Sequence, residues 1–401
     1  MSTETVRLPV ARPLLLLTGL LLIASVLRAP VTGVAPMLDM IQSTYGLTRA
    51  QAGLLTTLPL VAFGVISPFA ALFARAHGIE RALFWALLVI VAGMIIRWFG
   101  PLWCLYVGTA GIGAGIAVAN VLVPGLVKRD FPARVPTVTG MCALMMGAVA
   151  AGVSAIAVPL SNAYGWRSAL GVVIVLPLLT LVVWGTQLGA HTAPAKGTAA
   201  MPHGRRMWRS AIAWQVTLYM GINSLLYYVL VAWLPGMLIA HGYSEAQAGS
   251  VHGLMQLACA VPGLVLGAMV SRMRDQKAIS VAMALTIGIA LLGFMYVPGW
   301  STVWAILFGI GSGAAIILSL MFMSLRVTSA HQAASLSGMA QCVGYLLAAC
   351  GPTLAGRVHD VTGSWNTVMA AGVVLAIVMA VFGGLAGRAR QMPAHHGHGH
   401  H

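Results

Sequence analysis

A single arginine, Arg28, lies well inside the first long apolar run of the chain. If this run is a helix, Ser25 and Thr32 share its face, because residues three and four positions apart are neighbours on a helix surface. A charge at the bilayer centre costs roughly 2.5–3.5 kcal/mol on insertion scales, so charges at that depth usually mark a functional site. A guanidinium is a planar, forked donor that suits a nitro group or a small anion. The alternative is a structural arginine that snorkels to the outer leaflet or bonds a carbonyl.

Two tyrosines in the apolar run 210–240 each follow a polar residue by one helical turn. Asn223 precedes Tyr227 at this spacing, and Ser224 precedes Tyr228. Aromatic rings that carry hydroxyls suit a flat heteroaromatic ligand, which they bind by stacking and a hydrogen bond. The alternative is a pair of tyrosines anchored at the membrane interface.

Further polar residues recur at helical spacing in other apolar runs. His252 and Gln256 share one helical face, and an imidazole titrates near neutral pH, so His252 is a candidate for binding substrate or protons. It is equally explained as a buried neutral histidine bonded to a carbonyl. Gln341 and Tyr345 share a face of another run, and Asn120 lies in the middle of a third. Each of these three either lines a central cavity or forms a hydrogen bond between helices.

Acidic residues are absent from the depth of every predicted run. Asp39 lies at the end of the first run, and the other acids fall in loops or near the N-terminus. Coupling to protons would therefore need His252, Asp39 or the solute itself, and the alternative is facilitated diffusion or exchange. The runs also lack a clustered acid, nucleophile or metal-ligand set. We expect no catalytic residue, cofactor or metal, and a membrane-embedded enzyme or sensor is the least favoured function.

The composition indicates that lipid surrounds most of this chain. Of its 401 residues, 59% are hydrophobic and only 7% are charged, whereas an average soluble domain is roughly 25% charged. A bilayer crossing needs about 20 apolar residues, and such runs recur along the whole sequence. We predict an all-α polytopic membrane protein with twelve transmembrane helices, at residues 13–40, 49–74, 80–98, 101–127, 136–162, 168–188, 210–240, 246–271, 278–297, 301–325, 334–357 and 366–387.

The net charge of +15 is distributed as in a membrane protein. Most basic residues lie in short loops on one side of the predicted helices, a pattern that places those loops and both termini in the cytoplasm. This explanation replaces nucleic-acid binding, for which we expect no role. The chain then divides into a helical bundle at 10–188, a cytoplasmic linker at 189–209, a second bundle at 210–388 and a His-rich disordered tail at 389–401.

The two halves repeat each other in sequence. The tetrapeptide AQAG at 50–53 returns at 246–249, and the GxGxG pattern at 111–115 returns at 309–313. Gly140 and Met141 are matched in the same order by a second Gly-Met pair. Because these matches share nearly one offset, they indicate a parallel duplication of six helices. Parallel six-helix repeats are the architecture of major facilitator transporters.

The sequence resembles the cyanate and 2-nitroimidazole transporter branch of the bacterial major facilitator superfamily, on the side of the 2-nitroimidazole exporters. The resemblance runs from residue 10 to residue 390. It is carried by LTTLPL at 55–60, PGLVKRDFP at 124–132, WQVT at 214–217, GINSL at 221–225, HGYSEAQ at 241–247 and SAHQA at 329–333. The resemblance implies two pseudo-symmetric six-helix bundles, an inner-membrane location and a small-molecule substrate. It also implies a carrier that works as a monomer in the lipid bilayer.

One loop departs from the superfamily pattern. Most members have an aspartate between the second and third helices, whereas Arg75 stands near that position here. The usual gating salt bridge is therefore in doubt. Glu80 with Arg81 is a candidate substitute, and the alternative is a solvated ion pair.

These observations lead to one main functional hypothesis. We expect a secondary transporter that moves a small, planar, polar or weakly acidic solute, similar to 2-nitroimidazole, by rocker-switch alternating access. Export from the cytoplasm is the expected direction. The alternative keeps the fold and changes the function to uptake or exchange of a small inorganic anion such as cyanate.

Overall fold

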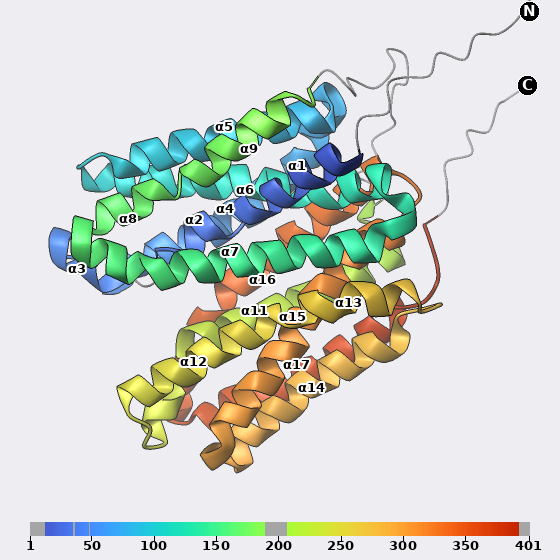
Figure 1. Ribbon diagram of the computed structural model, residues 1–401. Helices are drawn as coiled ribbons and strands as arrows, with labels where there is room; N and C mark the ends of the chain where they lie inside the picture. Colours follow the sequence, from blue (N-terminus) through green and yellow to red (C-terminus); the bar gives the residue numbers. More distant parts are fainter. Residues whose placement is uncertain (1–12, 35–36, 48, 189–206, 393–401) are drawn as a thin grey trace, which may run out of the picture.

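The computed structural model describes residues 13–34, 37–47, 49–188 and 207–392 (Figure 1). These residues form helices and the turns that join them, without a strand. Most of the predicted linker 189–209, and the predicted tail from residue 393 onward, lie outside the described residues.

Helices of the first half begin at Pro13 and end at Gly185. In chain order they are α1 (Pro13–Val26), α2 (Ala29–Thr32), α3 (Leu38–Tyr45), α4 (Arg49–His77), α5 (Ile79–Trp98), α6 (Leu102–Asp130), α7 (Val135–Tyr164), α8 (Trp166–Val172) and α9 (Val175–Gly185).

Helices of the second half begin at Ala211 and end at Ala386. They are α11 (Ala211–Ala240), α12 (Glu245–Ala260), α13 (Pro262–Ser271), α14 (Lys277–Tyr296), α15 (Ser301–Leu325), α16 (Ala330–Thr362) and α17 (Trp365–Ala386).

Twelve helical segments among the described residues are long and apolar enough to cross a membrane, which confirms the predicted number. The first predicted span, 13–40, was too long. The observed span covers Pro13–Thr32, and α3 is a separate short helix that ends at the left-handed Gly46. Glycine suits this position because it adopts a positive φ without a steric penalty.

Each half has its own apolar core. Leu83 and Trp184 are fully buried in the first core, and Phe308 and Phe322 are fully buried in the second. Figure 1 shows the two groups of helices as two bundles, which meet at one end and diverge toward the other. The bundles meet at the end where α1 begins and α17 ends, which we call the termini end.

The first membrane span is interrupted at Leu27 and Arg28, between α1 and α2. Pro30 explains this break, because a proline has no N–H to donate to the carbonyl four residues before it. The Arg28 carbonyl caps α2 by accepting the N–H of Thr32 at 3.0 Å. On the other side of the break, the buried Arg97 of α5 donates from Nη1 to the Pro30 carbonyl at 2.9 Å. Arg97 thereby fixes the position of the break.

A second interruption lies in the other half. Val261 separates α12 from α13, and Pro262 is the first residue of the new helix. Proline favours this first position because the N–H that it lacks would have no helical partner there.

A proline in α6 provides the hydrogen bonds that join the bundles at the termini end. Pro124 cannot donate to the Asn120 carbonyl, and Gln341 of α16 donates to this carbonyl from Nε2 at 3.0 Å instead. The Pro124 carbonyl accepts the hydroxyl of Ser324 of α15 at 2.8 Å. We call these four residues the interbundle latch.

Close backbone packing accompanies the interbundle latch. A Cβ at Gly125 of α6 would lie 2.8 Å from the Ala330 carbonyl oxygen, and one at Gly338 of α16 would lie 2.9 Å from the Ser67 carbonyl oxygen. Such contacts leave no room for a side chain. All these residues lie in the half of their helix nearer the termini end, so the bundles are closed there.

Arg326 ties three helix ends of the second bundle together, just beyond the last residue of α15. Its guanidinium donates to the Ala386 carbonyl at 2.7 Å, to the Gly387 carbonyl at 3.2 Å and to the Gln276 side chain. Burial lowers the pKa of Arg326 to about 10, so the group stays charged at neutral pH. This clasp makes the termini end of the second bundle a single unit.

Candidate functional site

The Arg28 side chain extends from the helix break to the second bundle. It is half-buried, and among the described residues its guanidinium has no hydrogen-bond or ion-pair partner. Its electrostatic neighbours are the hydroxyls of Tyr227, Tyr228 and Tyr345 and the thiol of Cys259. All four belong to α11, α16 and α12, so one bundle supplies the cation and the other supplies its polar surroundings.

Aromatic rings from both bundles gather in this region. Tyr345 packs edge-on against Phe63 of α4, with ring centroids 4.9 Å apart, and Tyr227 packs edge-on against Tyr228 at 5.1 Å. Tyr228 and Tyr345 also contact the apolar core of the first bundle. Together with Arg28, Cys259 and Gln256, these four rings form what we call the central cluster.

Gln256 belongs to the central cluster through a hydrogen bond. The Tyr227 hydroxyl donates to Gln256 Oε1 at 2.6 Å, which joins α11 to α12. His252 is one turn earlier on α12, where its Nε2 lies 3.1 Å from the Val231 carbonyl. This contact is the carbonyl bond that we gave as the alternative for His252, and its role in binding substrate or protons stays a prediction.

Three other predicted site residues bond to backbone carbonyls. Ser25 donates to the Leu22 carbonyl at 2.6 Å, and Thr32 donates to the Arg28 carbonyl at 3.2 Å. Asn223 is buried and donates to the Ser312 carbonyl at 3.2 Å, across the contact of α11 and α15. Their hydrogen bonds therefore support the helices, and direct contact with a ligand stays a prediction for each.

Gln341 and Asn120 lie side by side in the interbundle latch. Gln341 is buried, and its Nε2 also lies 2.8 Å from the Ser337 hydroxyl. The structure thus provides the bond between helices that we gave as one alternative for this pair. Asp39 lies in α3, and its side chain is outside the described residues.

The predicted Glu80–Arg81 pair is wrong. Glu80 is buried and forms an ion pair with Arg129 of α6 at 2.6 Å, whereas Arg81 is exposed. Arg129 also contacts Asp130 at 2.7 Å. Adjacent helical residues point in different directions, and here only the Glu80 side faces α6.

Two members of the central cluster were not predicted from the sequence. Phe63 is one of ten phenylalanines and lies in an ordinary apolar run, so nothing in its type or spacing marks it. Cys259 follows Gln256 at i+3 on the same face of α12, and this spacing was a usable signal.

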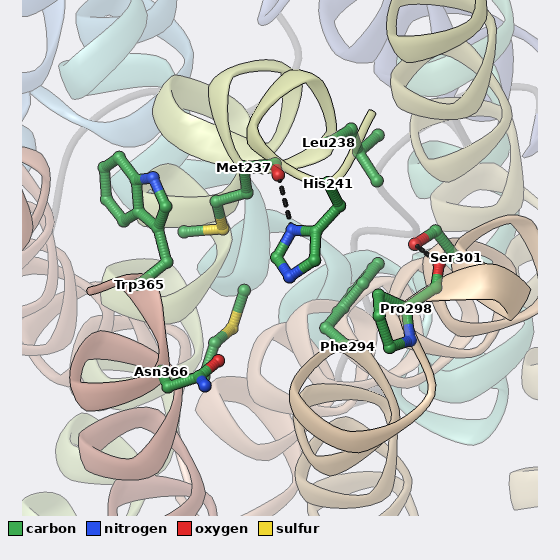
Figure 2. Close-up of a pocket in the computed structure, with 9 residues that line it drawn as sticks. Met237, Leu238, His241, Phe294, Pro298, Ser301, Trp365 and Asn366 are labelled. Carbon is green, nitrogen blue, oxygen red and sulfur yellow. Dashed lines mark hydrogen bonds between the residues drawn. The ribbon is translucent and has the colours of Figure 1, made fainter. Parts of the chain in front are cut away.

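A small pocket lies elsewhere, at the far end of the second bundle (Figure 2). It has a volume of about 10 Å³, which is room for one water molecule. His241 faces it and has Nδ1 2.8 Å from the Met237 carbonyl. Trp365 and Phe294 form its apolar walls. None of the central-cluster residues lines this pocket, so it is a separate packing defect.

Comparisons with known proteins agree with this architecture. The family model described as "Major Facilitator Superfamily" matches residues 20–352. The chain is 52% identical to the 2-nitroimidazole transporter of Escherichia coli (strain K12), with 94% of this chain and 97% of the relative covered. It is 28% identical to the cyanate transport protein CynX of the same organism, with 87% and 91% covered. A crystal structure of FucP in the outward conformation has the same fold, with a TM-score of 0.76 at 14% identity and with 94% of this chain and 99% of FucP covered.

The family match covers most of the chain, and its relatives and fold are those of transporters rather than enzymes. The twelve apolar helices make the protein a multi-pass membrane protein. The chain therefore belongs to the major facilitator superfamily of secondary transporters.

Proposed function

We propose that this protein exports a small, planar, polar or weakly acidic solute of the 2-nitroimidazole type. The observation that carries the proposal is the Arg28 guanidinium, which has no partner among the described residues and faces hydroxyls of the opposite bundle. A group of this kind is a preformed site for a pair of acceptor oxygens. The 2-nitroimidazole transporter of Escherichia coli, at 52% identity, supports the choice of solute.

The central cluster matches both parts of such a solute. The forked guanidinium offers parallel N–H groups to the two oxygens of a nitro group. The rings of Tyr227, Tyr228, Tyr345 and Phe63 offer flat apolar surface to a heteroaromatic ring. Because the guanidinium belongs to the first bundle and the three tyrosines belong to the second, a bound solute connects the bundles.

We propose rocker-switch alternating access as the mechanism. The interbundle latch closes the termini end, and the bundles diverge toward the other end (Figure 1). Rocking of one bundle against the other about the central cluster would open the termini end and close the opposite end. We further propose that a monomer works in the bacterial inner membrane, with both termini in the cytoplasm.

Binding to the purified protein tests the proposal. We expect isothermal titration calorimetry to detect binding of 2-nitroimidazole and to show at least about tenfold weaker binding for Arg28→Ala, because a hydrogen bond to a charged group contributes about 1.5–3 kcal/mol. The exposed Arg272→Ala is the matched control and should bind as the wild type does. Unchanged affinity in Arg28→Ala would remove Arg28 from the site.

A second candidate function is uptake or exchange of a small anion such as cyanate. The lone cation of the central cluster favours it on electrostatic grounds, and the relative named as a cyanate transport protein supports it. Uptake of both solutes into proteoliposomes that contain the purified protein distinguishes the two candidates. Faster saturable uptake of cyanate would favour the second.

A further inference from the structure

The charge of the central cluster changes when the site is filled. Among the described residues, the groups around the Arg28 guanidinium are neutral hydroxyls and a thiol. The empty cluster therefore carries one positive charge. A solute with one negative charge makes it neutral, whereas a neutral solute leaves the charge uncompensated.

No carboxylate of a described membrane span replaces the solute. Glu80, Asp130 and Asp360 are within the first or last three residues of their spans. Glu80 and Asp130 are already paired with Arg129. Asp39 and Glu245 fall outside the spans altogether. Among the described residues, therefore, no carboxylate side chain compensates Arg28 at its depth, and a bound anion would do so.

The charge of Arg28 matters most during reorientation, the step in which the carrier closes at one end and opens at the other. In the structure, Arg28 as a residue is half-buried, so part of its surface stays accessible. Alternating access requires a state in which both ends are closed, and there the guanidinium loses water. An unpaired charge is costly in such a place, and a charge with a hydrogen-bonded counter-ion is much less so. The loaded carrier therefore reorients faster than the empty one.

We propose that the protein is an anion exchanger whose substrates share a single negative charge. This inference rests on the proposed function, because it concerns the same site. It defines the substrate class as small planar monoanions, which includes cyanate and the ionised form of a nitroimidazole. Dianions are poor substrates because they leave the loaded site with a negative charge. Export of one monoanion is then driven by entry of another.

Counterflow into proteoliposomes tests the exchange. Uptake of labelled cyanate and of labelled 2-nitroimidazole is measured into vesicles that hold unlabelled cyanate, unlabelled 2-nitroimidazole or neither. We expect initial rates at least about tenfold higher in loaded than in empty vesicles. A ratio of this size follows if the bound anion lowers the barrier to reorientation by about 1.4 kcal/mol. Exchange should not respond to a membrane potential set with potassium and valinomycin, because the loaded carrier is neutral.

The pH dependence identifies the transported form. Cyanate is ionised throughout the neutral range, so its exchange should be flat there. Exchange of 2-nitroimidazole should rise with pH as its ring N–H ionises. Equal rates in loaded and empty vesicles, or net uptake driven as fast by a pH gradient, would overturn the exchange proposal. Absence of protein-dependent uptake of either solute in every vesicle would instead overturn the proposed function.

Variants of Arg28 test whether anion exchange depends on the charge of the central cluster. Arg28→Gln makes the empty cluster neutral, so the ratio of loaded to empty rates should fall toward one. Arg28→Lys keeps the charge and should keep the ratio, although its affinity falls because an ammonium lacks the planar fork. Arg272→Gln, at an exposed position, is the control. If Arg28→Gln elutes as an aggregate, Arg28→Lys and the wild-type ratio still decide the question.

Discussion

At Arg28 the backbone and the side chain have separate tasks. The carbonyl caps α2 by bonding Thr32, and the guanidinium faces the tyrosines of the other bundle. The break between α1 and α2 makes this division possible. The helix is interrupted at Arg28, so its side chain can point toward the second bundle while its carbonyl caps α2. Arg97 holds the break in place from α5.

Tyr227 offers a test at the same scale. Tyr227→Phe removes the hydroxyl that donates to Gln256 and leaves the ring in place. Loss of this bond should lower stability by about 0.5–1.5 kcal/mol. Because the hydroxyl also borders the Arg28 guanidinium, we expect solute affinity to fall about three- to tenfold as well. Titration calorimetry and a thermal melt measure the two effects.

Tyr219 supplies a matched control for Tyr227. It is fully buried in the second bundle, and its hydroxyl donates to the Ser280 carbonyl at 3.2 Å, away from Arg28. Tyr219→Phe should lower stability and leave affinity unchanged. The same loss of affinity in both variants would show that Tyr227 acts only through the fold.

The sequence identified Arg28 because a charge inside an apolar run is conspicuous. Ser25 and Thr32 share its face, yet each bonds a carbonyl of its own helix. Sequence spacing does not show whether such a hydroxyl binds a ligand or a carbonyl of its own helix, because it can reach either one. Phe63 could not be predicted from the sequence, because the contact that places it in the central cluster is with Tyr345 of the other bundle.

At the scale of helices, the latch shows how a proline in α6 creates contact between bundles. Pro124 leaves the Asn120 carbonyl without its helical partner, and Gln341 takes the place of the missing N–H. An unsatisfied carbonyl in the membrane would cost several kcal/mol. The conformation that is closed at the termini end is therefore stabilised by a bond that lasts only while the bundles touch.

Removing Gln341 should shift the protein toward opening at the termini end. For Gln341→Ala we expect the amide hydrogens near the latch, in α6 and α16, to exchange about tenfold faster. Hydrogen–deuterium exchange with mass spectrometry measures this change.

Gln187→Ala is the matched control for the latch. Gln187 is buried, and its Nε2 donates to the Leu15 carbonyl at 3.0 Å, the distance found for Gln341, but both partners belong to the first bundle. This variant should lower stability without changing exchange at α6 and α16. If the two variants speed amide exchange in α6 and α16 equally, the interbundle latch does not control opening at the termini end.

Helix boundaries were the weaker part of the element prediction. The predicted first span was too long because most of 13–40 is apolar, and apolarity alone does not show where a chain turns. The break depends on Pro30 together with Arg97, which is distant in sequence.

For the whole molecule, composition and internal repetition were sufficient to predict the fold. Only 7% of the residues are charged, too few to cover the surface of a soluble protein of this length, so most of the surface faces lipid. The repeated motifs then determined two six-helix bundles, and the structure and its family confirm them. The sequence could not predict which end is closed, because this depends on contacts between bundles.

Orientation in the membrane is testable at this scale. The excess of basic residues at the termini end predicts that both termini are cytoplasmic. A green fluorescent protein fused after Met392 should fluoresce, and alkaline phosphatase fused there should be inactive. The same reporters placed after Gly242, at the opposite end of α11, should give the reverse result. Active phosphatase after Met392 would invert the assigned direction of transport.

The interruptions of the spans Pro13–Thr32 and Ser250–Ser271 have a mechanical consequence. Arg28 is at the first interruption, and its neighbour Cys259 is two residues before the second, at Val261. The helical ladder is incomplete at both points, so these are the most compliant joints of the two spans. If a solute binds between them as proposed, it contacts both spans beside these incomplete stretches of helix, where bending breaks the fewest hydrogen bonds, whereas the Arg326 clasp holds the helix ends of the second bundle together.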